Sequence, residues 1–338
     1  MAEGRLRFGL LGCGMIARFH ADALLRIENA VLVGVADVSA SFAADFADKY
    51  GIVAYADYEA MLADPNIDAV CICTPSGLHK ENALQALHAG KHVVLEKPMA
   101  FTAAEAAELE KAAEESGCVL TVVSQLRYSK DICRVKALME ENAFGTPVLC
   151  DLYMKYWRDP AYYAGSTWKG TRRFDGGGAL MNQGIHGMDI LLYLAGNAKV
   201  LYAKNRTHFH NIEVEDVSVA MLEFENGATG VIEASTCANP GFERRLEIIG
   251  TEGSVILVEN RIEKLILGGE TVIDGSSEPI PCTASDPAAM GCELHVMQLQ
   301  NFVSAVQNGS RLAVTAADGR RAVALIEEIY NFSENKGR

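Results

Sequence analysis

A lysine at the end of a short apolar run is the first feature of this 338-residue chain that suggests chemistry. Glu96-Lys97-Pro98 follows His92 to Leu95, a run typical of a strand buried in a parallel sheet. Oxidation of an alcohol requires loss of a hydride from carbon and of a proton from oxygen. A partly desolvated lysine beside a cationic nicotinamide would hold its proton less tightly and could accept that proton. From spacing alone, a surface lysine in a turn is the better interpretation.

A second candidate lies in a later, mostly apolar segment. Asn182, His186 and Asp189 are spaced so that they would share one face of a helix. Gly176-Gly177-Gly178 precedes them and would allow close backbone approach. Polar and ionisable residues along one face of an otherwise apolar helix indicate a catalytic or binding site. The alternative is a capping network, in which Asn182 caps the helix and Asp189 pairs with a core histidine.

A third cluster mixes aromatic and cationic residues before the glycine run. Aromatic rings stack on sugar faces, and arginines clamp carboxylates or phosphates. We therefore predict substrate contacts from Tyr156, Trp157, Arg158, Trp168 and Arg172, with Arg127, Asn182 and His186 added from neighbouring segments. A packing loop between two domains explains the same cluster equally well.

A glycine motif near the N-terminus predicts dinucleotide binding. Gly12-Cys13-Gly14-Met15-Ile16-Ala17 follows a predicted strand and opens a predicted helix, whose N-terminus would attract a pyrophosphate. Asp37 ends the second predicted strand, where a carboxylate binds a ribose 2′-hydroxyl and repels a 2′-phosphate. No arginine follows Asp37 up to Ser41, so NAD is favoured over NADP. An ordinary turn with a helix cap at Asp37 is the alternative.

Other residues are expected at the same edge, because ligands bind beyond the carboxyl ends of parallel strands. Thr74-Pro75-Ser76 follows one predicted strand, although a plain turn capped by Ser76 is as good an explanation. The full predicted cofactor set is Gly12, Gly14, Met15, Ile16, Ala17, Asp37, Thr74, Pro75, His79, Glu96 and Lys97.

The elements that must position these residues are readable in residues 1–125. Short runs rich in Val, Ile, Leu and Cys alternate with segments of helical spacing. The runs are Leu6 to Leu11, Val31 to Ala36, Ala69 to Cys73, His92 to Leu95 and Val119 to Val123. The helical segments are Ile16 to Ile27, Ala40 to Tyr50, Lys80 to Ala89 and Ala103 to Ser116. This order predicts a doubly wound α/β Rossmann domain with a parallel sheet.

Residues 126–338 have a different pattern and are predicted to form a second, α+β domain for substrate binding and oligomer contacts. Alternating stretches such as Val148 to Trp157 and Val200 to Phe209 indicate a large open-faced mixed or antiparallel sheet. Helical patterns lie at Asp131 to Glu141, Gly184 to Leu194, His295 to Gln307 and Ala316 to Asn331. Helices would cover one sheet face, and a second copy is expected on the other, giving a homodimer or homotetramer.

Composition and charge exclude several classes of partner. The formal net charge of -14 argues against general binding of nucleic acid or anionic membranes. We expect neither a secretory signal nor a membrane span, which would need a run of about 20 apolar residues. The nine cysteines have no framework spacing, which indicates reduced core thiols and a cytoplasmic protein. His208-Phe209-His210 has no evident third ligand, so no metal site is predicted.

Taken together, these motifs resemble the glucose–fructose oxidoreductase/inositol dehydrogenase (Gfo/Idh/MocA) family. The resemblance rests on GLLGCGMIA, the AD at Asp37, TPSGLH, LEKP, GGGALMNQGIHGMD, VEDVSVAMLEFENGATG and DGRRAVALIEEIY. It implies an NAD-dependent dehydrogenase of a small-molecule sugar, polyol such as inositol, or nucleotide-sugar. In that reading Lys97 is the general acid/base, His186 hydrogen-bonds the reacting hydroxyl, and the Lys97–Pro98 peptide is cis.

One position departs from the family pattern. Inositol dehydrogenase-like members carry aspartate four residues before the histidine, where this chain has Asn182. An amide accepts no proton, so Lys97 remains as the main base and His186 orients the substrate. Two other functions stay open: an NAD-retaining glycosidase, which oxidises its substrate transiently, and a non-catalytic NAD-binding regulator.

Overall fold

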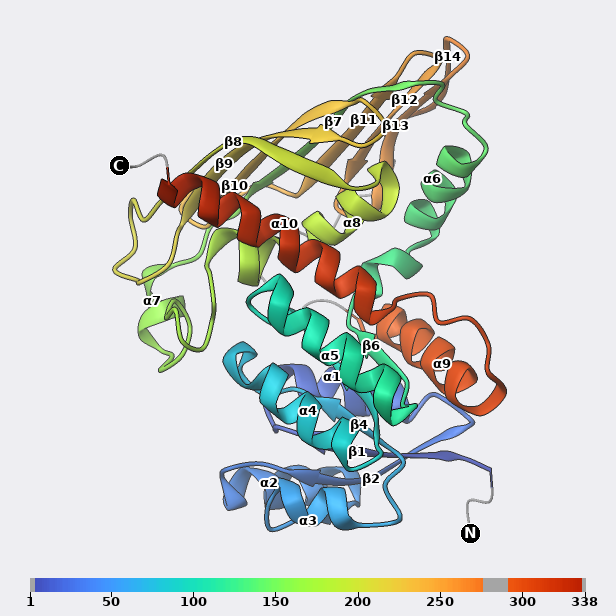
Figure 1. Ribbon diagram of the computed structural model, residues 1–338, viewed down its shortest axis with the longest axis vertical. Helices are drawn as coiled ribbons and strands as arrows, with labels where there is room; N and C mark the ends of the chain where they lie inside the picture. Colours follow the sequence, from blue (N-terminus) through green and yellow to red (C-terminus); the bar gives the residue numbers. More distant parts are fainter. Residues whose placement is uncertain (1–3, 276–290, 336–338) are drawn as a thin grey trace. The chain divides into compact units, whose positions relative to one another are not determined.

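The computed structural model describes residues 4–275 and 291–335 of the chain. They form two compact units (Figure 1). Of the described residues, unit 1 contains 4–125 and 291–320, and unit 2 contains 126–275 and 321–335. The boundary at Gln125 coincides with the predicted end of the first domain.

Unit 1 is built on a six-stranded sheet in the order β3-β2-β1-β4-β5-β6. Every pair of neighbouring strands is parallel, which confirms the predicted doubly wound fold. The strands are β1 (Leu6–Leu11), β2 (Ala30–Ala36), β3 (Val53–Ala54), β4 (Ala69–Ile72), β5 (His92–Leu95) and β6 (Leu120–Val122). Strand β4 is buried along its whole length, as expected of a strand covered on both faces.

Two helices of unit 1 begin at side-chain hydroxyl caps and end at left-handed glycines, Gly51 and Gly117. The Ser39 hydroxyl accepts a hydrogen bond from the Phe42 N–H, and the Thr102 hydroxyl accepts one from the Glu105 N–H. The helices are α1 (Met15–Leu24), α2 (Ala40–Tyr50), α3 (Tyr58–Ala63), α4 (His79–His88), α5 (Ala103–Ser116) and α9 (Glu293–Asn308). Helix α3 and the two-residue strand β3 were not predicted, because elements this short carry too little periodicity.

Helix α9 corrects the predicted extent of the second domain. It packs against α1, and its Phe302 ring lies 6.0 Å from the ring of Phe8 on β1. The Gln298 side chain accepts a hydrogen bond from the Ser124 N–H and donates one to the Val122 carbonyl. Residues 291–320 therefore belong to unit 1, although the sequence placed everything after residue 125 in the second domain. An apolar stripe shows that a helix has a buried face but not which sheet it covers.

Unit 2 contains an eight-stranded sheet in the order β14-β13-β12-β11-β7-β10-β9-β8. Only β7 and β10 pair in parallel, so the sheet is mixed and mainly antiparallel, as predicted. The strands are β7 (Pro147–Lys155), β8 (Ala198–Arg206), β9 (Val217–Phe224), β10 (Thr229–Ser235), β11 (Arg245–Gly250), β12 (Gly253–Val258), β13 (Arg261–Leu267) and β14 (Glu270–Asp274).

Helices cover one face of this sheet. Helix α8 (Ile185–Ala195) packs against β7 and β11, while α6 (Lys130–Glu140) packs against α8 and β13. The other helices of the second half are α7 (Pro160–Ala164) and α10 (Ala316–Asn335), which crosses from unit 1 into unit 2. None of the helices in the described ranges is both long and apolar enough to cross a membrane.

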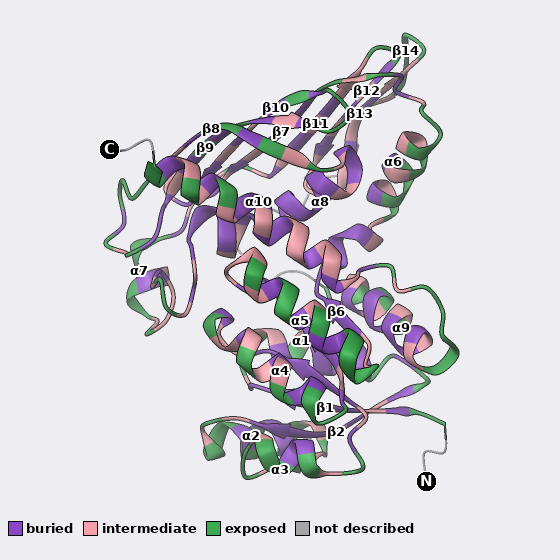
Figure 2. Cartoon of the chain, viewed as in Figure 1, coloured by how far each residue is buried: buried purple, intermediate pink, exposed green. Residues whose placement is uncertain are grey.

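Along most strands of this sheet, buried residues alternate with half-buried or exposed ones in the single chain (Figure 2). Burial alternates along β9, where Val219 and Met221 are 41% and 48% exposed. Met221 pairs with Tyr202 of β8, which is also exposed. Exposed apolar side chains side by side on a sheet are typical of an interaction surface.

Candidate functional site

The predicted cofactor turn lies at the carboxyl end of β1. Gly12 has φ +96°, and a Cβ there would lie 2.8 Å from the Cys73 carbonyl oxygen, so only glycine fits. A Cβ on Gly14, the N-cap of α1, would meet no atom within 4 Å, which leaves room for a bound group. The turn therefore presents backbone N–H groups at a helix N-terminus, as a pyrophosphate requires.

Asp37 is joined to this turn by hydrogen bonds. Its carboxylate accepts the Cys13 N–H and the Ser39 N–H, both at 2.8 Å. The carboxyl ends of β1 and β2 are thus held together with the acidic group between them. The residues present fit the adenosine half of NAD, with Asp37 available to a ribose hydroxyl. Of the other motif residues, Met15 is exposed, Ile16 is half-buried, and Ala17 is fully buried where helix meets sheet.

The loop after β4 is tied to the loop after β5 by a buried histidine. The His79 ring nitrogens lie 2.7 Å from the Pro98 carbonyl oxygen and 2.9 Å from the Thr74 carbonyl oxygen. Burial lowers the pKa of His79. His79 is therefore a support beneath the edge rather than a cofactor contact, which corrects the prediction. Thr74 and Pro75 are half-buried at the edge, and Ser76 caps no helix but lies in a 3-10 turn.

Glu96 is also turned into the protein. Its carboxylate accepts a hydrogen bond from His20 Nε2 at 2.8 Å and another from the Lys97 N–H at 3.2 Å. At 5% exposure Glu96 cannot present its side chain to a cofactor, so this prediction is corrected too. Lys97 itself is half-buried, and the Lys97–Pro98 peptide is cis, as the family resemblance implied.

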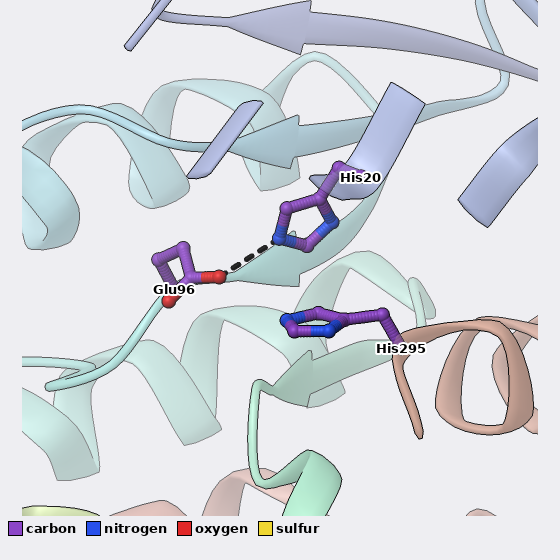
Figure 3. Close-up of side chains that lie close together, drawn as sticks. All are labelled: His20, Glu96 and His295. Atoms are coloured by element: carbon purple, nitrogen blue, oxygen red, sulfur yellow. Dashed lines mark hydrogen bonds and ion pairs between the residues drawn. The ribbon is translucent and has the colours of Figure 1, made fainter. Parts of the chain in front are cut away.

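His20, Glu96 and His295 form a buried triad that the sequence did not reveal (Figure 3). Each of the three residues offers one possible metal ligand, a ring nitrogen or a carboxylate oxygen. These three atoms lie within 4.8 Å of one another, so the set could suit a metal ion. Two ligands of one zinc ion would stand about 3.3 Å apart. His20 and Glu96 instead stand at hydrogen-bond distance. We interpret them as a hydrogen-bonded ion pair beside a neutral His295.

The charges of the triad follow from burial and neighbours. Burial opposes the ionised form of His20, but Cys71 and Glu96 outweigh it and raise the pKa of His20. Burial likewise opposes ionised Glu96, but His20 outweighs it and lowers the pKa of Glu96. Burial and the charge of His20 lower the pKa of His295 to about 4. Within the described residues, neither ring nitrogen of His295 has a hydrogen-bond partner.

His295 should make the protein sensitive to acid. A histidine kept neutral in the fold takes up a proton on unfolding, so stability should fall as pH drops from about 6.5 towards 4. His295→Phe keeps a ring and removes the titration. Between pH 7.5 and 5, urea unfolding should show wild type losing about 2 kcal/mol more than this variant. Equal losses in both proteins would show that the fold does not lower the pKa of His295.

In unit 2, the glycine run positions the second candidate group. A Cβ on Gly178 would lie 2.0 Å from the Glu215 carbonyl oxygen, so the backbone approach requires glycine. The buried Glu215 carboxylate accepts the Gly178 N–H at 3.0 Å, the Leu180 N–H at 2.9 Å and the Tyr330 hydroxyl at 2.9 Å. Sequence reasoning missed Glu215, although it lies within the VEDVSVAMLEFENGATG segment.

The helical stripe is not continuous. Ala179–Gly184 is a π-helical turn, and the α-helix α8 begins only at Ile185. Asn182 therefore does not share one α-helical face with His186 and Asp189. Within α8 only His186 and Tyr193 are partly exposed, and all other residues are buried. His186 is thus the histidine that α8 leaves partly exposed.

Asn182 belongs to a polar network. Its amide donates a hydrogen bond to the buried Asp175 carboxylate, and its carbonyl oxygen accepts one from Gln183 at 3.0 Å. The Gln183 Oε1 atom accepts a hydrogen bond from the Arg158 guanidinium at 2.7 Å, and Gln183 Nε2 donates one to the Tyr162 hydroxyl at 2.9 Å. A carboxylate therefore stands directly behind the amide that replaces the family aspartate.

Asn182→Asp is therefore expected to damage the protein. Two carboxylates would face each other, so one must take a proton or the turn must open. Stability at pH 8 should fall by about 1–3 kcal/mol and recover towards pH 5, where a proton can be shared. Urea unfolding followed by tryptophan fluorescence measures this, because both tryptophans lie in unit 2. The exchange Asp175→Asn/Asn182→Asp should restore stability; failure to do so would contradict the contact.

The predicted aromatic and cationic contacts fall into two groups. Tyr156 and Arg158 are buried, and Arg158 lies over the rings of Tyr156 and Tyr162. Trp157 and Trp168 are partly exposed, whereas Arg172 is exposed and donates to the Glu213 carbonyl. Lys169, half-buried beside them, places its ammonium 3.7 Å from the centre of the Tyr162 ring. Trp157, Trp168 and Lys169 remain candidates for ligand contact.

Two predictions in unit 2 are wrong in detail. Arg127 makes a two-point ion pair with Asp189, at 2.9 and 2.6 Å, and both side chains are almost fully buried. Arg127 is therefore a core residue, and Asp189 pairs with it rather than with a histidine. His208 and His210 lie beyond the end of β8, where His210 is buried and its Nδ1 lies 3.2 Å from the Asp216 carboxylate.

Comparison with known proteins agrees with the geometry. Residues 6–124 match the model of an oxidoreductase family with an NAD-binding Rossmann fold, and residues 132–256 match the GFO/IDH/MocA C-terminal domain. The chain belongs to the Gfo/Idh/MocA family. This membership confirms the predicted resemblance and makes the chain an oxidoreductase with an NAD-binding domain.

Several relatives resemble it over most of its length. An uncharacterised Bacillus subtilis oxidoreductase, YrbE, is 31% identical and covers 75% of this chain and 74% of its own. Myo-inositol 2-dehydrogenase of Thermotoga maritima is 26% identical, and the match covers 95% of this chain and 94% of that protein. Among solved structures, the WlbA dehydrogenase of Bordetella pertussis, in complex with NADH and UDP-GlcNAcA, is 30% identical and has a TM-score of 0.87. The match covers 98% of this chain and 97% of that chain.

Proposed function

We propose that the chain is an NAD(H)-dependent dehydrogenase that transfers a hydride between nicotinamide and a secondary hydroxyl or keto group of a sugar, inositol or nucleotide-sugar. The observation that carries this proposal is the position of Lys97. It follows β5 at the carboxyl edge of the sheet whose β1 end bears the cofactor turn. Ligands of such sheets bind at that edge.

Lys97 is proposed as the general acid/base. When bound, NAD⁺ supplies the hydride acceptor. Neutral Lys97 takes the proton of the substrate hydroxyl, and the ammonium that results returns this proton to water after the ketone forms. In the reverse direction the same ammonium protonates the developing alkoxide. General acid–base catalysis of this kind contributes about 10²–10⁴-fold to a rate.

His186 is proposed to orient the reacting oxygen by a hydrogen bond. It is partly exposed in the first turn of α8, directly after the segment that holds Asn182 and Gln183. The rings of Trp157 and Trp168 and the Lys169 ammonium would contact a sugar and its anionic substituent. This substrate class agrees with the inositol and nucleotide-sugar ligands in the names of the relatives.

A substrate panel tests the proposal. The purified chain is incubated with NAD⁺ and with myo-inositol, scyllo-inositol, levoglucosan or UDP-GlcNAcA, and NADH is followed by absorbance. NADH formation with at least one compound is expected. Cleavage of a glycoside without net NADH would indicate a retaining glycosidase instead, and NADH binding with no turnover of any compound would favour a regulator.

We also propose that the exposed face of the unit 2 sheet binds a second copy of the chain. Val219 and Met221 of β9 lie on this face beside Tyr202. Met221→Glu should place unpaired charges in a homodimer or homotetramer interface and shift the protein towards monomer. Light scattering after size-exclusion chromatography measures this, with the exposed Met297→Glu on α9 as the matched control. A wild-type monomer at micromolar concentration would contradict the proposal.

A further inference from the structure

The backbone of Lys97 is held from two sides by buried side chains. On one side the Glu96 carboxylate accepts the Lys97 N–H at 3.2 Å. On the other, a ring nitrogen of His79 lies 2.7 Å from the Pro98 carbonyl oxygen. Both supporting side chains are almost completely buried. They fix the turn from which the Lys97 side chain leaves.

His20 extends this support to the cofactor turn. It lies in the second turn of α1, the helix whose first residue, Met15, follows Gly14. Its Nε2 is 2.8 Å from one oxygen of Glu96, while the other oxygen accepts the Lys97 N–H. Figure 3 shows the bond between His20 and Glu96. A single carboxylate therefore connects the helix that begins at the cofactor turn with the backbone of Lys97.

Of the two neighbouring histidines, His20 and His295, His20 is the one that bonds to the Glu96 carboxylate. Its ring lies 5.6 Å from that of His20 and 5.8 Å from that of Phe19, and it is as buried as His20. Within the described residues it makes no hydrogen bond through either ring nitrogen. His295 therefore packs in the same cluster without supporting the carboxylate by a hydrogen bond.

We propose that His20 is a positioning residue for proton transfer: through Glu96 it sets the place of Lys97 relative to the cofactor helix. The inference rests on the role of Lys97 in the proposed function. It assigns to His20 and Glu96 no contact with substrate or cofactor. A displacement of about 1 Å at a reacting group can cost about a hundredfold in rate, so support of this kind matters.

The experiment compares three variants of the full-length protein. His20→Leu removes the hydrogen bond to Glu96, His20→Gln retains an amide donor, and His295→Phe changes the neighbouring ring that makes no such bond. In the presence of NAD⁺, each is treated with a trace of acetic anhydride between pH 6 and 10. Mass spectrometry measures acetylation of Lys97, with the exposed Lys111 as internal reference.

His20→Leu should change the labelling rate of Lys97 by about threefold or more and shift its pH profile, because the surroundings of the amine change. His20→Gln should return the profile to that of wild type, and His295→Phe should leave it unchanged. An unchanged profile in His20→Leu would overturn the proposal, as would equal changes in His20→Leu and His295→Phe, since both would indicate packing alone.

This outcome is distinct from failure of the proposed function. Acetic anhydride reports the amine of Lys97 whether or not that amine transfers a proton. If the substrate panel yields no NADH, the dehydrogenase function fails while the labelling result stands. If NADH forms but His20→Leu labels like wild type, only the positioning role of His20 fails.

Discussion

Lys97→Met is expected to lower the rate of NADH formation by about 10²–10⁴-fold while leaving NADH binding within about twofold of wild type. The side chain keeps its approximate volume but loses the group that accepts the hydroxyl proton. The residual rate should rise with pH, since hydroxide can then replace the missing base. Steady-state kinetics from pH 6 to 10 and a fluorescence titration with NADH measure both expectations.

Lys80→Met is the matched control. Lys80 lies in the same unit, in the first turn of α4, and its ammonium pairs with the exposed Glu108. Its replacement removes the same charge from the protein without touching the β5 edge. A Lys97→Met enzyme as fast as Lys80→Met would show that another group transfers the proton.

Arg127→Met is expected to destabilise unit 2 by about 3–5 kcal/mol, because it leaves the Asp189 carboxylate buried without its cation. The pair is closed on all sides: both side chains are at most 6% exposed, and the guanidinium lies 4.6 Å from the centre of the Tyr193 ring. Urea unfolding followed by tryptophan fluorescence reports on this unit, since both tryptophans lie in it.

A double variant separates two contributions to the free energy of unfolding: the destabilisation by an unpaired buried charge and the net stabilisation by the ion pair. Arg127→Met/Asp189→Leu removes both charges and fills similar volumes, so most of the lost stability should return. The single variant should retain NADH binding by unit 1, because the cofactor turn lies in that unit. Wild-type stability in Arg127→Met would contradict the buried ion pair and reopen a substrate role for Arg127.

Features that depend on neighbouring residues were predictable from the sequence. The cofactor turn needs Gly12 for its backbone and Gly14 for space, and both requirements hold in the structure. The caps at Ser39 and Thr102 are equally local, because each hydroxyl lies three residues before the free N–H that it accepts. The doubly wound sheet followed from the order of apolar runs and helices.

Features that depend on contacts between distant segments were not predictable. The periodicity around Asn182 is that of an α-helix, but the close approach of Gly178 to Glu215 accompanies a π-helical turn there. Arg127 resembled a ligand contact because no local pattern identifies Asp189 as its partner. Glu96 and His79 were placed at the correct edge, yet whether a side chain points outward or inward depends on His20 and Pro98.

The proposed activity is transfer of a hydride from a carbinol carbon of the substrate to NAD⁺. The most direct measurement uses myo-inositol and UDP-GlcNAcA deuterated at their carbinol carbons, with NAD⁺ and wild-type protein, and examines the nicotinamide by mass spectrometry. One deuterium is expected in each NADH formed from the substrate that is oxidised. NADH without deuterium, or deuterium lost to water with no NADH formed, would contradict it.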